Sequence, residues 1–166
     1  MVTVLLGPVA LKKKIAGVRY KNFTFFDELK DLLRSELKKK YDIVIHAAAV
    51  SDYRPEKESK NKIRSGKKKL RLTLVPTRKL IDPIKRFAPD VFLVGFKLES
   101  TLNRRSAVSA TKDLFEGARC DLVVANRSAG QRYEGYILNG KGNILAGAKT
   151  KEELARKLVK TLKESV

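Results

Sequence analysis

The chain has 166 residues, of which 43% are hydrophobic, and 37 Lys and Arg against 18 Asp and Glu give a formal net charge of +19. This length suits one domain with a buried core, spanning residues 1–166. No apolar run reaches the roughly 18–20 residues that cross a bilayer, and single Cys and His residues argue against a disulfide framework and a zinc site. We therefore predict a cytoplasmic protein with no membrane contact and no metal-binding side chains.

The positive charge invites comparison with nucleic-acid-binding proteins. The basic residues are nevertheless spread along the chain, in Lys12–Lys14, Lys38–Lys40, Lys67–Lys69, Arg104–Arg105 and the C-terminal helix. The sequence contains no aromatic RNA-recognition motif and no zinc finger. We expect most of this charge to be solvated surface without specific nucleic-acid binding. Part of it could instead handle a phosphorylated, anionic substrate.

The first half of the chain predicts alternating strands and helices. Val2–Leu6 is a short apolar strand, and Val18 and Tyr20 indicate another. Thr24 is the expected N-cap of a helix whose apolar residues continue with helical spacing to Leu37. That helix leads to a strand over 42–46, which reads as buried on both faces. Strand, helix and strand predict a βαβ unit with a right-handed crossover.

A polar, lysine-rich loop is predicted over 55–69, followed by an alternating and therefore half-buried strand over 70–75. Thr77 is expected to cap a short helix that runs to Phe87. Residues 91–96 read as a buried strand and residues 105–117 as a helix with Gly117 as its C-cap.

The remaining elements are a strand over 121–126, a hairpin and a last helix. The hairpin pairs 134–138 with 143–146 around an Asn-Gly turn. Thr150 and Glu153 have capping-box spacing at the start of the helix. The predicted fold is α/β, a three-layer Rossmann-like arrangement with a mainly parallel sheet and a C-terminal β-hairpin.

A candidate ligand site follows the strand over 42–46. Three small residues, Ala47–Ala49, would let a ligand lie against the backbone, and Asp52, Tyr53 and Arg54 come next. The carboxyl ends of strands in an open α/β sheet are where ligands bind. A buried strand leading into an alanine-rich turn is the alternative, but the adjacent acidic, aromatic and basic residues favour a binding site.

Other strand ends carry Gly95, Phe96 and Asn126. Gly95 would permit close backbone approach, and Phe96 offers a ring face for a nucleotide base. Alternatively, Phe96 packs in the core and Asn126 caps the next turn. We predict that Ala47, Ala48, Asp52 and Phe96 line one pocket at the carboxyl edge of the sheet.

Lys62 lies in the polar loop, ten positions after Asp52. Most loop lysines are simply solvated. Lys62 could instead act from a mobile flap that closes over a phosphate and neutralises the charge developing during nucleotidyl transfer.

Four blocks, taken in order, carry a family resemblance. They are Ala-Ala-Ala-Val-Ser-Asp-Tyr-Arg-Pro at 47–55, Lys62-Ile63-Arg64, Val94–Glu99 and Asp121–Asn126. Together they resemble the phosphopantothenoylcysteine synthetases, also called phosphopantothenate–cysteine ligases, which act in coenzyme A biosynthesis. The resemblance extends over nearly the whole chain and argues against an RNA-binding protein.

The resemblance implies an acid–amino-acid ligase that activates phosphopantothenate with CTP or ATP, accompanied by Mg²⁺, as an acyl-nucleotide. Cysteine then displaces the nucleotide. It also implies a homodimer. The resemblance further implies that Lys62 takes part in catalysis and contacts the phosphates of the nucleotide. The other nucleotide-binding residues it implies are His46, Ala47, Ala48, Asp52, Arg78, Lys79, Leu80, Ile81 and Phe96.

Two departures from the family pattern leave two functions open. Family members begin with a strand and a glycine-rich segment before the equivalent of Val2, so we expect that first strand, turn and helix to be missing from 1–166. Two family lysines are matched by Leu114 and Ala118, for which Lys112 or Arg119 could substitute. The chain is therefore either the major part of a ligase or a truncated nucleotide-binding module without complete activity.

Overall fold

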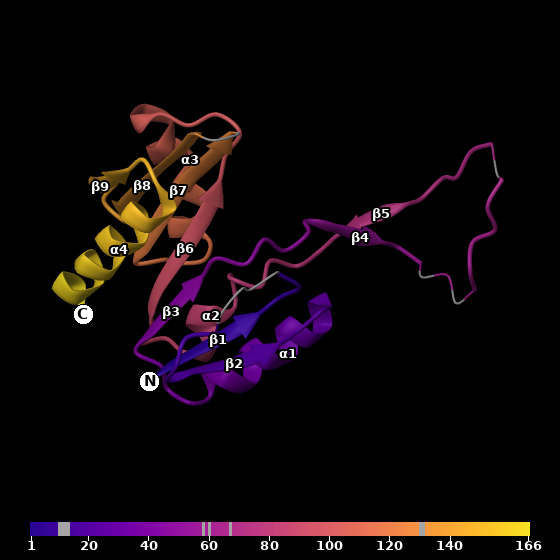
Figure 1. Ribbon diagram of the computed structural model, residues 1–166, viewed down its shortest axis with the longest axis horizontal. Coiled ribbons are helices and arrows are strands. Elements are labelled where there is room, and N and C mark those ends of the chain that lie inside the picture. Colours follow the sequence, from indigo (N-terminus) through magenta and orange to yellow (C-terminus); the bar gives the residue numbers. More distant parts are fainter. Residues whose placement is uncertain (10–13, 58, 60, 67, 130–131) are drawn as a thin grey trace.

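A five-stranded sheet, in the order β3-β6-β7-β8-β9, forms the centre of the protein (Figure 1). The computed structural model describes residues 1–9, 14–57, 59, 61–66, 68–129 and 132–166. The strands of this sheet are β3 (Ile43–His46), β6 (Phe92–Leu98), β7 (Leu122–Ala129), β8 (Arg132–Asn139) and β9 (Ile144–Ala148).

The sheet is mixed, so the prediction of a mainly parallel sheet is not confirmed. Strands β3, β6 and β7 run parallel, whereas β7–β8 and β8–β9 are antiparallel pairs. The reason lies in the length of the connections, because two residues separate β7 from β8 and four separate β8 from β9, too few for a parallel crossover. The predicted C-terminal hairpin is β8–β9, and it contains a bulge between Ile137 and Leu138.

Helices cover both faces of this sheet (Figure 1). Helix α4 (Lys151–Ser165) packs on one face, where Leu154, Leu158 and Leu162 join a core with Val94 and Val124. On the opposite face, Leu93 and Val123 pack with α1 (Phe26–Leu37) and α2 (Ile84–Phe87), and α3 (Arg104–Glu116) covers the same side. Successive side chains of β6 and β7 point to opposite faces of the sheet and therefore pack into two separate cores.

Helix α4 begins as predicted, because Thr150 Oγ1 accepts a hydrogen bond from the Glu153 backbone N–H. Helix α1 does not. Its N-cap is Phe25 rather than the expected Thr24. The carboxylate of Glu28 accepts the backbone N–H groups of both Thr24 and Phe25, at 2.7 and 3.1 Å. The Glu28 carboxylate thus makes the reciprocal contact of a capping box, in which the N3 side chain accepts the N–H of the N-cap residue.

Strands β1 (Val2–Leu6) and β2 (Val18–Asn22) form a separate parallel pair, so the predicted β-α-β unit is not joined into one sheet. Strand β3 is consequently an edge strand, and Ile45 is 49% exposed instead of buried. The basic segment at 10–13, including Lys12 and Lys13, lies outside the described residues.

A ribbon of β4 (Tyr53–Pro55) and β5 (Leu74–Pro76) forms an arm that projects from the body of the protein (Figure 1). The half-buried strand expected over 70–75 is wrong in extent and burial, since Leu70, Leu72 and Leu74 are 53%, 61% and 54% exposed. They stay exposed because the arm has no second layer to cover them. Residues 58, 60 and 67 of the predicted loop lie outside the described part of the chain.

No helix in the described ranges is long and apolar enough to cross a membrane.

Glu36 connects α1 to the β1–β2 pair. Its buried carboxylate contacts the Lys21 and Lys39 ammonium groups at 2.7 Å each. The Tyr41 hydroxyl donates to it and lies 2.9 Å from Thr3 Oγ1. Hydrogen bonds from Lys21, Lys39 and Tyr41 lower the pKa of Glu36 from 4.5 to about 2.

We predict that Glu36→Gln lowers the free energy of unfolding at pH 7 by on the order of 2 kcal/mol. A lowered carboxyl pKa stabilises the fold above the unfolded-state value near 4.5, and this stability is lost as the pH falls through about 2. Urea unfolding at pH 7, 4.5 and 3 should show a flatter pH dependence for Glu36→Gln. The control is Glu116→Gln, whose carboxylate is exposed; equal effects of both variants would contradict the prediction.

Candidate functional site

The carboxyl ends of β3, β6 and β7 meet at one edge of the sheet. His46 is paired with Gly95, and Leu98 is paired with Asn126. The Asn126 carbonyl also accepts the Glu99 backbone N–H at 2.9 Å. Only His46 is at the end of its strand, because β6 continues beyond Gly95 to Leu98 and β7 beyond Asn126 to Ala129. Gly95 is level with Val123, so Asn126 lies three positions further along the sheet than His46 and Gly95.

His46 and Phe96 belong to opposite faces of the sheet at this edge. Phe96 packs against the α4 core. His46 alternates with Ile45, and its partner Gly95 lies on the face that holds Ile81 and Cys120. The single pocket predicted for Ala47, Ala48, Asp52 and Phe96 stays a prediction.

Gly95 has a packing role. A Cβ at this position would lie 2.9 Å from Cys120 Sγ, 3.2 Å from Ile81 Cδ1 and 3.3 Å from Leu114 Cδ1. Side chains, and not an open ligand space, therefore occupy the room that the glycine leaves. The close approach predicted at Gly95 is real, but protein atoms make it.

The segment 78–81 divides into two halves. Arg78 and Lys79 are exposed, whereas Leu80 and Ile81 are buried. The side chains of Leu80 and Ile81 are thus core side chains, and only their backbone is left for a ligand.

The two positions of the family lysines are also packed, because Ala118 is buried and Leu114 contacts the core near Gly95. Lys112 is exposed on α3 and pairs with Glu116, while Arg119 is exposed.

The base of the arm brings Asp52 next to Thr77. The Thr77 backbone N–H donates to the Asp52 carbonyl oxygen at 2.8 Å. Beyond it, the chain between β4 and β5 forms the far end of the arm, and Lys62 is exposed within this stretch. The chain between β4 and β5, to which Lys62 belongs, extends away from the sheet that contains β3 and β6 (Figure 1).

Three polar side-chain atoms are buried without a hydrogen-bond partner among the described residues, namely His46 Nε2, Thr77 Oγ1 and Arg127 Nε. Arg127 Nε lies 3.3 Å from Glu134 Oε2 in an ion pair, whereas, within the described ranges, no ion pair involves the other two. Burial lowers the pKa of His46, so its imidazole is neutral at pH 7. The sequence led us to expect a helix cap at Thr77, but α2 begins at Ile84 with Pro83 as its N-cap. In the sequence, the one sign that Thr77 belongs to a site is that it directly precedes Arg78, a predicted nucleotide-binding residue.

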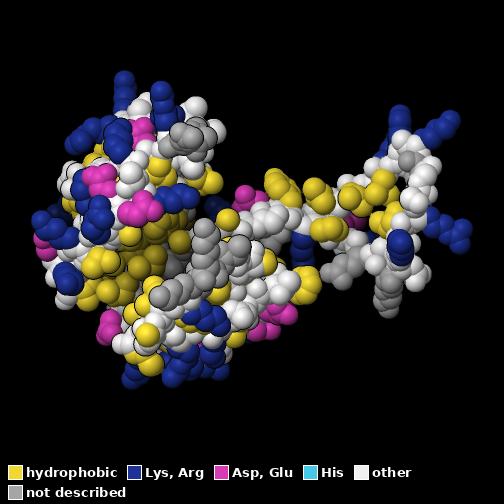
Figure 2. Space-filling model, in the orientation of Figure 1, with side chains coloured by type: hydrophobic (Ala, Val, Ile, Leu, Met, Phe, Trp, Pro, Cys, Tyr) yellow, Lys and Arg dark blue, Asp and Glu magenta, His cyan; other side chains and the backbone are white. Residues whose placement is uncertain are grey.

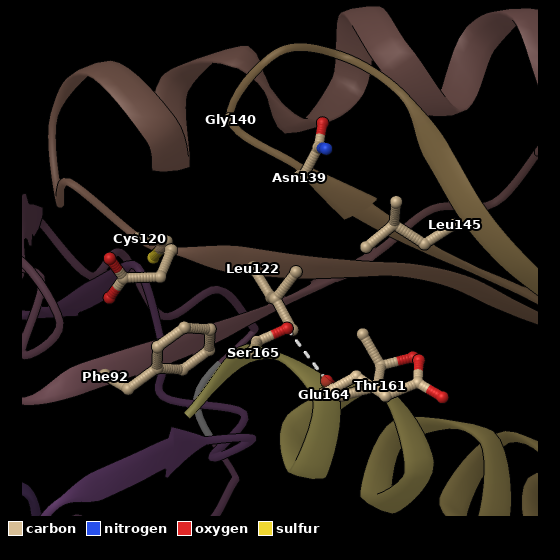
Figure 3. A pocket seen from close by; sticks show the side chains of 10 residues that line it. Phe92, Cys120, Leu122, Asn139, Gly140, Leu145, Thr161, Glu164 and Ser165 are labelled. Atoms are coloured by element: carbon tan, nitrogen blue, oxygen red, sulfur yellow. Dashed lines mark hydrogen bonds between the residues drawn. The ribbon is translucent and has the colours of Figure 1, made fainter.

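A hollow of about 750 Å³ lies at the other edge of the sheet (Figure 3). It is lined by the start of β6 and β7, the turn after β8 and the end of α4, including Phe92, Cys120, Asn139 and Ser165. Burial raises the pKa of the Cys120 thiol to about 12, with a smaller contribution from Asp121. The thiol therefore stays protonated and is not a nucleophile in this hollow.

The model of the DNA/pantothenate metabolism flavoprotein C-terminal domain family matches residues 1–166. The chain belongs to this family. The resemblance inferred from the four sequence blocks is therefore confirmed. Relatives support it: the chain is 43% identical over 136 residues to the coenzyme A biosynthesis bifunctional protein CoaBC of Thermococcus kodakarensis, covering 80% of this chain and 34% of that protein.

The CoaBC protein of Methanocaldococcus jannaschii is 28% identical over 136 residues, which cover 79% of this chain and 33% of that protein. The chain thus spans about a third of the length of these relatives. Among solved structures, the DNA/pantothenate metabolism flavoprotein of Streptococcus pneumoniae matches with a TM-score of 0.84 at 23% identity, covering 99% of this chain and 81% of that one. A Cab2 variant in complex with phosphopantothenate-cysteine matches with a TM-score of 0.66 at 20% identity, covering 81% and 47%.

We predict that Gly95→Ala destabilises the protein by about 1–3 kcal/mol, because the added methyl group meets Cys120, Ile81 and Leu114. Cys120→Ala opens space on the same spot, so the double variant should recover part of the loss in thermal or urea unfolding. Cys120→Ala alone is the control for the shared site. Unchanged stability in Gly95→Ala would mean that the space is free, as a ligand site requires.

Proposed function

We propose that this domain carries out phosphopantothenate–cysteine ligation in coenzyme A biosynthesis, in the cytoplasm. The observation that carries the proposal is the match of the whole chain to the family, together with 43% identity to a CoaBC protein. A structural neighbour crystallised with phosphopantothenate-cysteine supports the choice of product. The nucleoside triphosphate, CTP or ATP, activates the phosphopantothenate carboxylate as an acyl-nucleotide and releases pyrophosphate. The cysteine amine then attacks the acyl carbon, and the nucleotide leaves.

The residues at the strand ends would bind the nucleotide by position and charge. We assign its base and ribose to the edge formed by His46, Ala47, Ala48, Asp52 and Phe96. Arg78, Lys79 and Lys62 are exposed cations for the phosphates, and the backbone of Leu80 and Ile81 completes the segment. Such chemistry needs mainly orientation and neutralisation of charge.

Mg²⁺ would enter bound to the triphosphate. It commonly takes phosphate oxygens and water with few protein ligands, which fits a site furnished with lysines and arginines. The cation would neutralise charge on the pyrophosphate as it leaves.

Lys62 is the residue we assign to catalysis. The far end of the arm carries many dark-blue Lys and Arg side chains (Figure 2), and this stretch must bend back for Lys62 to reach the phosphates. Once the arm has closed, the attraction between its Lys and Arg side chains and the bound triphosphate would hold the arm in the closed position.

We predict that Lys62→Ala weakens triphosphate binding or slows pyrophosphate release about 10- to 100-fold, as expected for a charge-assisted hydrogen bond. Its melting temperature should equal that of the unaltered chain, because the Lys62 side chain is exposed. Calorimetric titration with CTP and ATP and a pyrophosphate assay measure both properties. Lys69→Ala, which removes another exposed lysine of the same arm, is the control. Equal losses in the two variants would show a general effect of charge.

We also propose a homodimer in which the arm contacts a second copy. Hydrophobic side chains lie along the arm (Figure 2), among them Leu70, Leu72, Leu74 and Tyr53, all more than half exposed. Apolar surface of this extent is stabilised when a partner covers it. In a two-fold symmetric dimer the same surface of both copies is in contact, so the arm of one copy would pack against the arm of the other.

We predict that Leu72→Ser/Leu74→Ser converts a dimer into a monomer, because the double change removes apolar area from the arm. Sedimentation equilibrium gives the mass, and circular dichroism should show unchanged helix content. Val159→Ser, at an equally exposed apolar side chain on α4, should remain dimeric. Identical masses for the unaltered chain and the arm variant would contradict this interface.

A nucleotide-binding module that needs a further segment is the second candidate. The favouring observation is that, within the described residues, β3 is at the edge of its sheet and β1 and β2 pair with each other alone. The relatives are about three times as long as the matched region. An assay with CTP or ATP, phosphopantothenate and cysteine separates the candidates. Product formation by residues 1–166 supports the complete ligase, whereas triphosphate binding without product supports the module.

A further inference from the structure

The Thr77 hydroxyl is buried and has no hydrogen-bond partner within the described residues. Leaving a buried hydroxyl unpaired costs free energy, because water no longer solvates it. The backbone around it is fixed, since the Thr77 N–H donates to the Asp52 carbonyl oxygen at 2.8 Å. This hydrogen bond fixes the main chain of Thr77 and does not involve the hydroxyl.

Thr77 begins the segment that returns from the arm to the sheet. Four positions later, Ile81 lies against Gly95, with its Cδ1 atom 3.2 Å from the Cβ position of that residue. Gly95 is paired with His46, whose Nε2 also has no partner among the described groups. Two buried polar groups without partners thus belong to the two segments that meet at the carboxyl edge of β3 and β6.

We infer that Thr77 is a binding residue for the nucleoside triphosphate, and that its hydroxyl hydrogen-bonds the bound nucleotide beside His46. The inference rests on the proposed function and adds a residue to its site. A hydroxyl can both donate and accept, so it suits a ribose hydroxyl or a phosphate oxygen. The exposed cations Arg78 and Lys79 are the next two residues, so positive charge is available beside Thr77 for the phosphates of the nucleotide.

Thr77→Val tests this directly, because valine keeps the shape and the β-branch while removing the hydroxyl. Removal of an unpaired buried hydroxyl should leave the melting temperature of the free protein unchanged or raise it. Binding of MgCTP or MgATP, measured by calorimetric titration, should weaken about 3- to 10-fold. Thr77→Ser restores the hydroxyl and should recover most of the affinity.

Thr73→Val is the matched control. Thr73 lies on the same arm, its carbonyl oxygen accepts the Glu56 N–H at 2.9 Å, and its side chain is exposed. It should bind the nucleotide as the unaltered chain does.

The outcomes separate this inference from the proposed function. No binding of either nucleotide by the unaltered chain overturns both. Normal binding by Thr77→Val overturns only the inference and assigns the hydroxyl to water. Equal weakening in Thr77→Ser and Thr77→Val also overturns it, because the hydroxyl would then not be the group that matters.

Discussion

Strand β6 is hydrogen-bonded on both sides, to β3 and to β7, and the placement of the site follows from this pairing. Asp121 reinforces it at the opposite end. Its Oδ2 accepts the Leu93 N–H at 2.7 Å and contacts Lys85 Nζ at 2.7 Å, while its own N–H donates to the Leu93 carbonyl. The three strands run in the same direction, so their carboxyl ends face the same side of the protein. Strand β3 ends first, with His46 beside Gly95, while β6 and β7 continue to Leu98 and Ala129.

The same side of the protein combines a closely packed part with an extended part. Gly95, Ile81 and Cys120 are closely packed, so the floor beneath the strand ends has little freedom. The arm, in contrast, is held at its base by a short β4–β5 ladder and by the hydrogen bonds of Asp52 and Glu56. A rigid floor suits recognition of a nucleotide, and an extended basic arm suits delivery of charge to its phosphates. This division of labour supports the proposed ligase chemistry.

Local sequence signals predicted those parts that depend on neighbouring residues. The cap at Thr150, the Asn-Gly hairpin and the run of helix α3 follow from short-range hydrogen bonds and spacing. The four family blocks identified the family, because specific residues at fixed separations carry that information. They could not show that Leu80 and Ile81 are core side chains, since burial depends on which elements pack together.

The sequence by itself thus determined the family and the strands β3, β6 and β7, but not the β4–β5 ribbon or the start of α2 at Ile84. Only the tertiary structure decided that the sheet is mixed, that β1 and β2 stand apart, and that the leucines of the arm are exposed. The physical reason is that pairing and burial are long-range properties. An alternating strand looks the same in sequence whether a second layer covers it or not, and an unpaired hydroxyl such as that of Thr77 is recognisable only when its surroundings are known.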